Sequence, residues 1–113
     1  MPYIKLNTNV DVADKSNVLR RLSQLAAKET GKPELYVMVA LTHNPEMLFA
    51  GKDVALAFLE FKSIGLTEKQ AKSLSASISE LLNTELSIAP DRIYIEFSNI
   101  PAAFWGYNGS TFG

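Results

Sequence analysis

The order of sequence patterns in the first half of the chain returns in the second half. When the 113-residue sequence is shifted by 57 positions, Ile4–Leu6 falls on Phe61–Ser63 and Pro33–Glu34 falls on Pro90–Asp91. Each half reads as a strand, a helix, a proline with an acidic residue, and a strand. Because β-α-β crossovers are right-handed, both helices should cover the same face of one sheet. The repeat predicts a single α/β (α+β) domain, residues 1–113, with a four-stranded mixed sheet and two helices.

Alternation and turn residues give the expected boundaries of these elements. Strands are expected at residues 3–7, 35–42, 54–62 and 92–97, with a further short strand at 47–49. The first helix should start at an acidic N-cap within residues 11–14 and end at Gly31, a typical C-cap residue. The second should start at Thr67, which forms a capping box with Gln70.

The expected sheet has a face that the chain cannot cover. The segments 35–42 and 54–62 read as apolar on both faces, a pattern typical of sheets that are buried on both sides. The two helices would cover only one side. We therefore expect subunits to pack sheet against sheet, although the pattern does not give their number.

The amino-acid composition argues against several classes of function. The net charge is −1 and no basic run is present, which argues against nucleic-acid binding. No apolar stretch is long enough to span a membrane, and no charged-then-apolar signal segment opens the chain, so a cytoplasmic protein is expected. The chain has no cysteine, and its one histidine, His43, lies in the turn-like segment THNPE. We expect a surface histidine, no metal site and no cofactor.

Pro2 has two interpretations. A proline at the edge of a strand offers no N–H and discourages edge pairing. Alternatively, removal of Met1, which is common before a small second residue, makes the Pro2 nitrogen a secondary amine. Burial and a nearby cation would lower the pKa of such an amine, which could then serve as a general base without any histidine.

Five blocks of sequence bear on this choice. They are MPYIKLNTN at the start, TGKP at residues 30–33, SIG at 63–65, PDRIYIEF at 90–97 and WGYNGSTF at 105–112. In this order and spacing the chain resembles, from end to end, the macrophage migration inhibitory factor family of the tautomerase superfamily. The resemblance implies a homotrimer whose sheets line a central barrel, with active sites between neighbouring subunits. It also implies keto–enol tautomerisation of α-keto acids such as phenylpyruvate, and of dopachrome analogues.

The same resemblance assigns candidate site residues. It implies that Pro2 is the base and that Lys32 holds the substrate carboxylate and lowers the pKa of Pro2. Taken alone, Lys32 is better interpreted as a solvated lysine at a helix end. It implies that the backbone N–H of Ile64 meets the substrate and that the adjacent subunit supplies Tyr94. The family's apolar pocket walls match Tyr3, Ile100, Trp105, Tyr107 and Phe112. Each also has an ordinary packing role as its alternative.

The chain departs from the family pattern at three places. Glu96 replaces an asparagine of the mammalian cytokines, and its carboxylate is expected to repel an anionic ligand, compete for Lys32 or raise the pKa of Pro2. Trp105 and Tyr107 move the aromatic bulk by two residues and narrow one side of the pocket. The family's Cys-x-x-Cys motif falls on leucines, so a thiol–disulfide activity is excluded.

Three functions remain under consideration. The first is a Pro2-dependent tautomerase acting on a small aromatic α-keto acid or enol. The second is a cytokine-like signalling or interaction protein with a vestigial pocket. The third is a trimeric scaffold without a site, in which Lys32 and Tyr94 would tolerate alanine.

Overall fold

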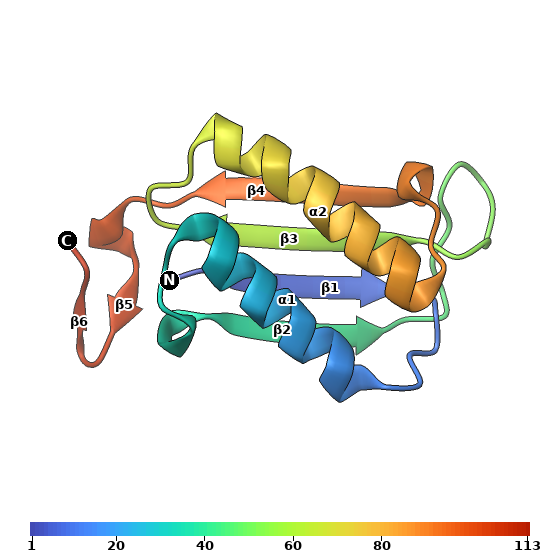
Figure 1. Ribbon diagram of the computed structural model, residues 1–113, viewed down its shortest axis with the longest axis horizontal. Helices are drawn as coiled ribbons and strands as arrows, with labels where there is room; N and C mark the ends of the chain where they lie inside the picture. Colours follow the sequence, from blue (N-terminus) through green and yellow to red (C-terminus); the bar gives the residue numbers. More distant parts are fainter.

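The chain forms a two-layer structure in which two helices cover one face of a four-stranded sheet, as a computed structural model of residues 1–113 shows (Figure 1). The sheet has the order β2-β1-β3-β4, with β1 antiparallel to β3 and both outer pairs parallel. Each parallel pair is connected by a helix, which confirms the two predicted β-α-β units. The elements are β1 (Tyr3–Thr8), α1 (Lys15–Thr30), β2 (Met38–His43), β3 (Ala57–Ser63), α2 (Glu68–Leu86), β4 (Ile93–Asn99), β5 (Gly106–Tyr107) and β6 (Ser110–Thr111).

The helices begin and end where local chemistry requires. Asp14 caps α1 by accepting a hydrogen bond from the Asn17 backbone N–H (3.1 Å), and Gly31 ends the helix in the left-handed conformation, at φ 70°. Thr67 and Gln70 form the predicted capping box of α2. The hydroxyl of Thr67 accepts from the Gln70 N–H (3.1 Å), and the Gln70 side chain accepts from the Thr67 N–H (3.0 Å).

Removing this capping box gives a testable stability effect. We expect Thr67→Ala to lower the free energy of unfolding by about 1 kcal/mol, because the Gln70 N–H loses its acceptor. The matched control is Thr84→Ala, at an exposed position within α2, which should change stability by less than about 0.5 kcal/mol. Urea denaturation of both variants measures the difference, and equal midpoints would contradict the cap's role.

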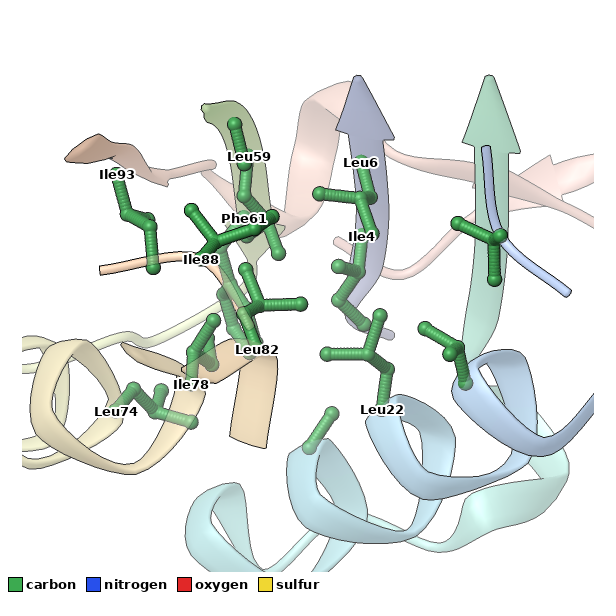
Figure 2. Close-up of a cluster of buried hydrophobic side chains, with 14 residues drawn as sticks. Ile4, Leu6, Leu22, Leu59, Phe61, Leu74, Ile78, Leu82, Ile88 and Ile93 are labelled. Carbon is green, nitrogen blue, oxygen red and sulfur yellow. The ribbon is translucent and has the colours of Figure 1, made fainter. Parts of the chain in front are cut away.

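The hydrophobic core lies between the helices and the sheet (Figure 2). Alternate residues of β1 and β3 point toward the helices, including Ile4, Leu6, Leu59 and Phe61, each of which is buried. Leu56 and Leu59, the two positions of the absent cysteine motif, are both buried. These positions therefore stabilise the fold through packing.

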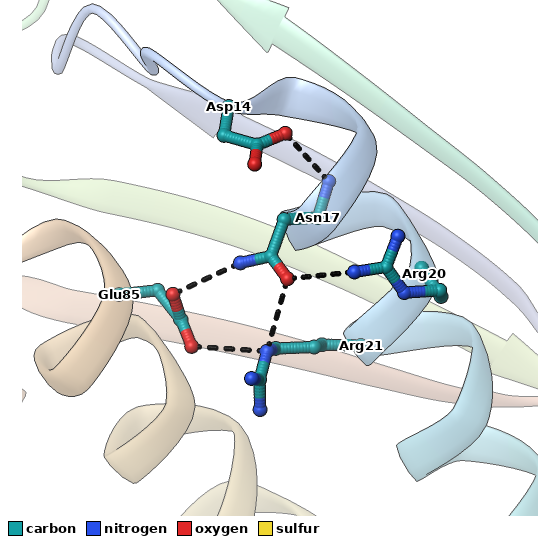
Figure 3. Close-up of polar contacts among 5 residues, drawn as sticks. All are labelled: Asp14, Asn17, Arg20, Arg21 and Glu85. Carbon is teal, nitrogen blue, oxygen red and sulfur yellow. Dashed lines mark hydrogen bonds and ion pairs between the residues drawn. The ribbon is translucent and has the colours of Figure 1, made fainter.

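A polar contact joins the two helices on the outer side of the core. Asn17 of α1 donates from its side-chain amide to Glu85 of α2 (3.0 Å), and Arg21 forms an ion pair with the same carboxylate (3.1 Å) (Figure 3). The Asn17 amide oxygen accepts from Arg20 and Arg21. The cluster lies on the helix layer, away from the opposite face of the sheet.

Three predicted strand boundaries are wrong. The second strand starts at Met38, because residues 34–36 form a 3-10 turn, η1 (Glu34–Tyr36), in which Val37 N donates to Glu34 O (3.0 Å). The third starts at residue 57 because the side chain of Arg92 binds the backbone carbonyls of Val54 and Ala55. The fourth, β4, starts after a second 3-10 turn, η2 (Pro90–Arg92).

Two further details differ from expectation. The short strand expected at 47–49 is a single antiparallel bridge between Phe49 and Lys52. His43 is exposed, as expected, but it ends β2 and does not lie in the turn.

The face of the sheet opposite the helices is mainly polar along β3, so the expectation that residues 54–62 are apolar on both faces is wrong. In β2 the expectation holds, because Met38 and Ala40 lie on this face while Val39 and Leu41 pack against the core. The alternation of β3 places Phe58, Glu60 and Lys62 on this open face. In the cross-strand register, Glu60 lies between Lys5 of β1 and Glu96 of β4. The apolar run in the sequence was misleading because its first residues belong to a loop.

Exposed apolar side chains gather at the two ends of the sheet. At the N-terminal end these are Leu35, Met38, Phe104 and Tyr107; at the opposite end they are Leu48, Val54 and Tyr94. Figure 1 shows the separation: the N-terminus and the β5–β6 hairpin lie at one end, and the loop between β2 and β3 lies at the other. None of the helices combines the length and the apolar character needed to cross a membrane.

Candidate active site

A cleft of about 610 Å³ opens at the N-terminal end of the sheet. Six of the predicted site residues line it: Pro2, Tyr3, Ile100, Trp105, Tyr107 and Phe112. The other lining residues are Met1, Leu35, Tyr36, Val37, Met38, Lys62, Phe104 and Gly106. The wall is therefore mostly apolar and aromatic, with few polar groups, as is common for sites that bind small molecules.

Pro2 is buried and fixed where β1 enters the sheet. Its carbonyl accepts a hydrogen bond from Met38 N (3.0 Å), where the parallel pairing of β1 and β2 begins with Tyr3 and Met38. Met1 carries the terminal amine into the cleft. Burial, and next to it the positive charge of Lys32, lower the pKa of this amine below its usual value. The cleft thus disfavours a protonated amine at this end of the chain.

The positive charge of Lys32 helps to lower the pKa of the terminal amine, although Lys32 does not line the cleft. It follows Gly31, whose left-handed conformation turns the chain out of α1. The Thr30 hydroxyl accepts from Lys32 N (3.3 Å) and donates to Ala26 O (2.6 Å). The end of α1 and this small hydrogen-bond network therefore set the direction in which Lys32 leaves the helix.

Three aromatic rings tie the C-terminal tail to the cleft. Tyr107 and Phe112 are stacked, with ring centroids 5.4 Å apart, and the edge-to-face contacts of Tyr36 with them are 5.6 and 6.3 Å. The small β5–β6 hairpin places Tyr107 in β5 and Phe112 directly after β6, and Phe112 N donates to Trp105 O (3.1 Å). The C-terminal tail, in which Trp105, Tyr107 and Phe112 were predicted to line the pocket, therefore forms one wall of the cleft.

Ile64 lies immediately after β3 and outside the cleft lining. The next two residues are fixed by Asn99, whose side-chain oxygen accepts from Gly65 N (3.0 Å) and Leu66 N (3.2 Å). The role expected for the Ile64 N–H stays a prediction.

Tyr94 and Glu96 are not part of the cleft of their own chain. In the sheet register Tyr94 aligns with Phe58, which aligns with Asn7, five residues beyond Pro2. That separation is roughly 16 Å along the strands and about 10 Å across them. Glu96 aligns with Glu60 and Lys5, nearer the middle of the open face. A role for either residue at a cleft of this kind requires a second copy of the chain.

Of the eight lining residues that were not predicted from the sequence, two, Tyr36 and Lys62, have polar side-chain groups. Tyr36 was assigned to a strand, whereas it is the last residue of η1. Lys62 is the only lysine or arginine in the lining, pairs with Tyr3 in the register and forms no ion pair within the chain. The signal for Lys62 was available: it directly precedes SIG, and alternation along 57–63 places it opposite the core. Nowhere in the chain do three His, Cys, Asp or Glu side chains gather closely enough to hold a metal ion.

The fold and the cleft define a class: two β-α-β units in one sheet, with a buried proline at position 2 in a mostly apolar, aromatic cleft. The sequence model of the family described as "Macrophage migration inhibitory factor (MIF)" matches residues 1–113. The chain belongs to this family. It is 38% identical to a macrophage migration inhibitory factor homolog of Brugia malayi, over the full length of both chains, and 38% identical to the macrophage migration inhibitory factor of Mus musculus, over 99% of each.

Solved structures agree with this assignment. The crystal structure of a macrophage migration inhibitory factor homologue from Prochlorococcus marinus superposes with a TM-score of 0.93 at 40% identity, covering 98% of this chain and 99% of the other. The structure of the Trichinella spiralis protein superposes with a TM-score of 0.91 at 34% identity, covering 97% and 99%. The predicted family and fold are thereby confirmed.

Proposed function

We propose that the protein is a keto–enol tautomerase of aromatic α-keto acids, of the phenylpyruvate type, and that Pro2 is its general base once Met1 has been removed. The same site would accept dopachrome-like substrates. The observation that carries the proposal is the terminal amine, whose pKa is lowered by burial and by Lys32 inside an aromatic cleft. Removal of Met1 moves the amine to Pro2, which is buried more deeply.

The chemistry follows from a proton that moves between carbon and oxygen. The free Pro2 nitrogen takes a proton from the carbon beside the keto group, and the electron pair of that C–H bond moves toward the keto oxygen. The resulting enolate is stabilised by the positive charge of Lys32 and by hydrogen-bond donors, and protonation of the oxygen gives the enol. The protonated Pro2 nitrogen returns the proton, so a C–H bond is exchanged for an O–H bond while the double bond moves from C=O to C=C; no oxidant, reductant or cofactor is needed.

The substrate class follows from the walls and charges of the cleft. Tyr36, Tyr107 and Phe112 offer ring faces and edges to a phenyl or indole group. Lys32 lies outside the lining but acts on the amine, and Lys62 adds a second unpaired cation, which does line the cleft. A substrate with an aromatic ring at one end and a carboxylate at the other matches this arrangement.

The proposal includes a closed ring of three copies, with each cleft completed by its neighbour. The exposed apolar groups at the two ends of the sheet differ, so they fit a head-to-tail contact better than a symmetric one. Head-to-tail contacts produce rings when the rotation closes. In such a ring the polar open faces, with Lys5, Glu60 and Glu96, line the central barrel, and Tyr94 of one copy enters the cleft of the next.

A cytokine-like binding protein is the second candidate. Two exposed side chains at the rim of the cleft, Leu35 (84%) and Phe104 (82%), offer an apolar contact surface for a partner protein. Binding of a partner would not depend on the protonation of Pro2, so the pH dependence of tautomerisation described below separates the enzyme from the binding protein.

The pH dependence of phenylpyruvate tautomerisation tests the proposal, using protein whose mass shows that Met1 is absent. The base works when it is unprotonated, so kcat/KM should rise with pH through the pKa of Pro2, and a lowered pKa places this rise at lower pH. Lys32→Ala removes a charge that disfavours the protonated amine. We therefore expect the rise to move to higher pH, and KM to increase roughly tenfold because a charged contact with the carboxylate is lost.

Lys69→Ala is the control, because Lys69 is an exposed lysine in the first turn of α2. It should leave both the pH profile and KM unchanged. An absence of tautomerase activity at every pH would reject the enzyme and favour the binding protein. A Lys32→Ala profile superimposable on that of the wild type would reject Lys32 as the source of the shift.

A further inference from the structure

The side chain of Arg92 organises the loop between β2 and β3 at the end of the sheet remote from the cleft. Its guanidinium donates to four backbone carbonyls of that loop: Phe49 O (2.7 Å), Val54 O (2.9 Å), Lys52 O (3.1 Å) and Ala55 O (3.5 Å). Arg92 is fixed by η2, where its N–H donates to Ala89 O (2.8 Å). One side chain therefore holds together residues that lie about 40 positions earlier in the chain.

The loop needs this support because its tip is strained. Ala50 and Gly51 both have left-handed backbone angles, φ 54° and φ 73°, which make a two-residue hairpin turn between Phe49 and Lys52. A left-handed alanine costs about 1–2 kcal/mol. The Arg92 bonds to carbonyls on both sides of the turn hold the tip in one conformation, and thereby fix the position of Phe49.

Phe49 lies between Arg92 and Tyr94 and contacts both side chains. The Arg92 guanidinium lies over the Phe49 ring, 5.0 Å from its centroid, in a cation–π contact. The Phe49 ring packs against Tyr94, with centroids 4.5 Å apart and planes inclined by 35°. Tyr94 is 63% exposed in the single chain, so this contact supplies much of what restrains its ring.

We propose that Arg92, acting through Phe49, is a positioning residue for Tyr94, and holds its phenol in place for the cleft of a neighbouring copy. The inference rests on the proposed function, in which Tyr94 completes that cleft. A ring that is already fixed loses less conformational entropy when it meets the substrate. The role requires arginine, because a lysine ammonium cannot direct planar N–H groups at four carbonyls and stack on a ring at the same time.

Two variants test the inference: Arg92→Lys, which keeps the charge, and Phe49→Leu, which removes the ring. Each should lower kcat/KM for phenylpyruvate roughly tenfold to a hundredfold. The pH at which the rate rises should not change, because Arg92→Lys keeps the positive charge and Phe49→Leu removes no charge. In a Tyr94→Phe background, which lacks the hydroxyl to be positioned, each variant should cause little further loss. If the losses multiply instead, the role is merely structural and the inference is wrong.

A second measurement does not depend on activity. In the NMR spectrum of the full-length protein, the Tyr94 ring signals, assigned with Tyr94→Phe, should carry a ring-current shift from Phe49. Arg92→Lys and Phe49→Leu should each reduce this shift. The matched control is Arg21→Lys, which alters an arginine paired with Glu85 on the helix layer (Figure 3) and should change neither the shift nor the rate.

The two readouts separate the failure of the inference from that of the proposed function. If the wild-type protein is inactive but Arg92→Lys still reduces the ring-current shift, the tautomerase is rejected and the Arg92–Phe49–Tyr94 arrangement stands. If the shift survives in Arg92→Lys, the arrangement is overturned even when the enzyme is active. A loss of folding in Arg92→Lys, seen by thermal denaturation, leaves Phe49→Leu to decide.

Discussion

Replacing Pro2 by glycine is expected to lower kcat/KM for phenylpyruvate tautomerisation by about a hundredfold or more. A positioned general base contributes about 10²–10⁴-fold, and that contribution requires the nitrogen to lie within reach of the substrate proton. The proline ring fixes the nitrogen against the wall of the cleft, whereas glycine is the least restricted residue. The amine of the variant would remain basic but would be free to move and to contact water.

The control for this substitution is Pro45→Gly, at an exposed proline beyond β2 and remote from the cleft. It should have the wild-type rate. A preparation of the wild-type chain that retains Met1 gives an independent comparison, because the Pro2 nitrogen is then an amide without a basic lone pair. It should lose as much activity as Pro2→Gly, or more. A wild-type rate in Pro2→Gly protein of confirmed mass and fold would exclude Pro2 as the base.

Local chemistry made a large part of the fold predictable. The caps at Asp14, Gly31 and Thr67 depend on short-range hydrogen bonds and backbone preferences, which a sequence carries directly. The β-α-β repeat gave the layers, and the handedness rule placed both helices on one face. Six cleft residues were predicted because the resemblance to a family spans the whole chain, and not because their own spacing required a site.

The errors arose where contacts between distant residues decide the structure. The start of β3 depends on the bonds of Arg92 to Val54 O and Ala55 O, which no local pattern at 54–62 indicates. Placing the strand three residues too early obscured its alternation, and with it the polar open face that includes Glu60 and Lys62. Tyr36 was missed for a related reason, since a 3-10 turn replaced the expected start of a strand.

Mixing two inactive variants should restore activity if Tyr94 acts in a neighbour's cleft. Tyr94 lies at the opposite end of the sheet from Pro2, so a complete site takes these residues from different copies. When Pro2→Gly and Tyr94→Ala chains are refolded together in equal amounts, about a quarter of the sites should combine an intact Pro2 with an intact Tyr94. The mixture should therefore exceed the mean activity of its parents and approach a quarter of the wild-type rate.

A second mixture provides the matched control. Pro2 and Lys32 act from the same chain, since Lys32 lowers the pKa of the amine at its own N-terminus. Mixing Pro2→Gly with Lys32→Ala therefore creates no complete site, and activity should stay at the mean of the parents. Native mass spectrometry shows whether mixed rings have formed and how many copies they contain. Mixed rings without recovery in the Tyr94→Ala mixture would show that Tyr94 does not act between subunits, and the cleft of a single chain would then have to function alone.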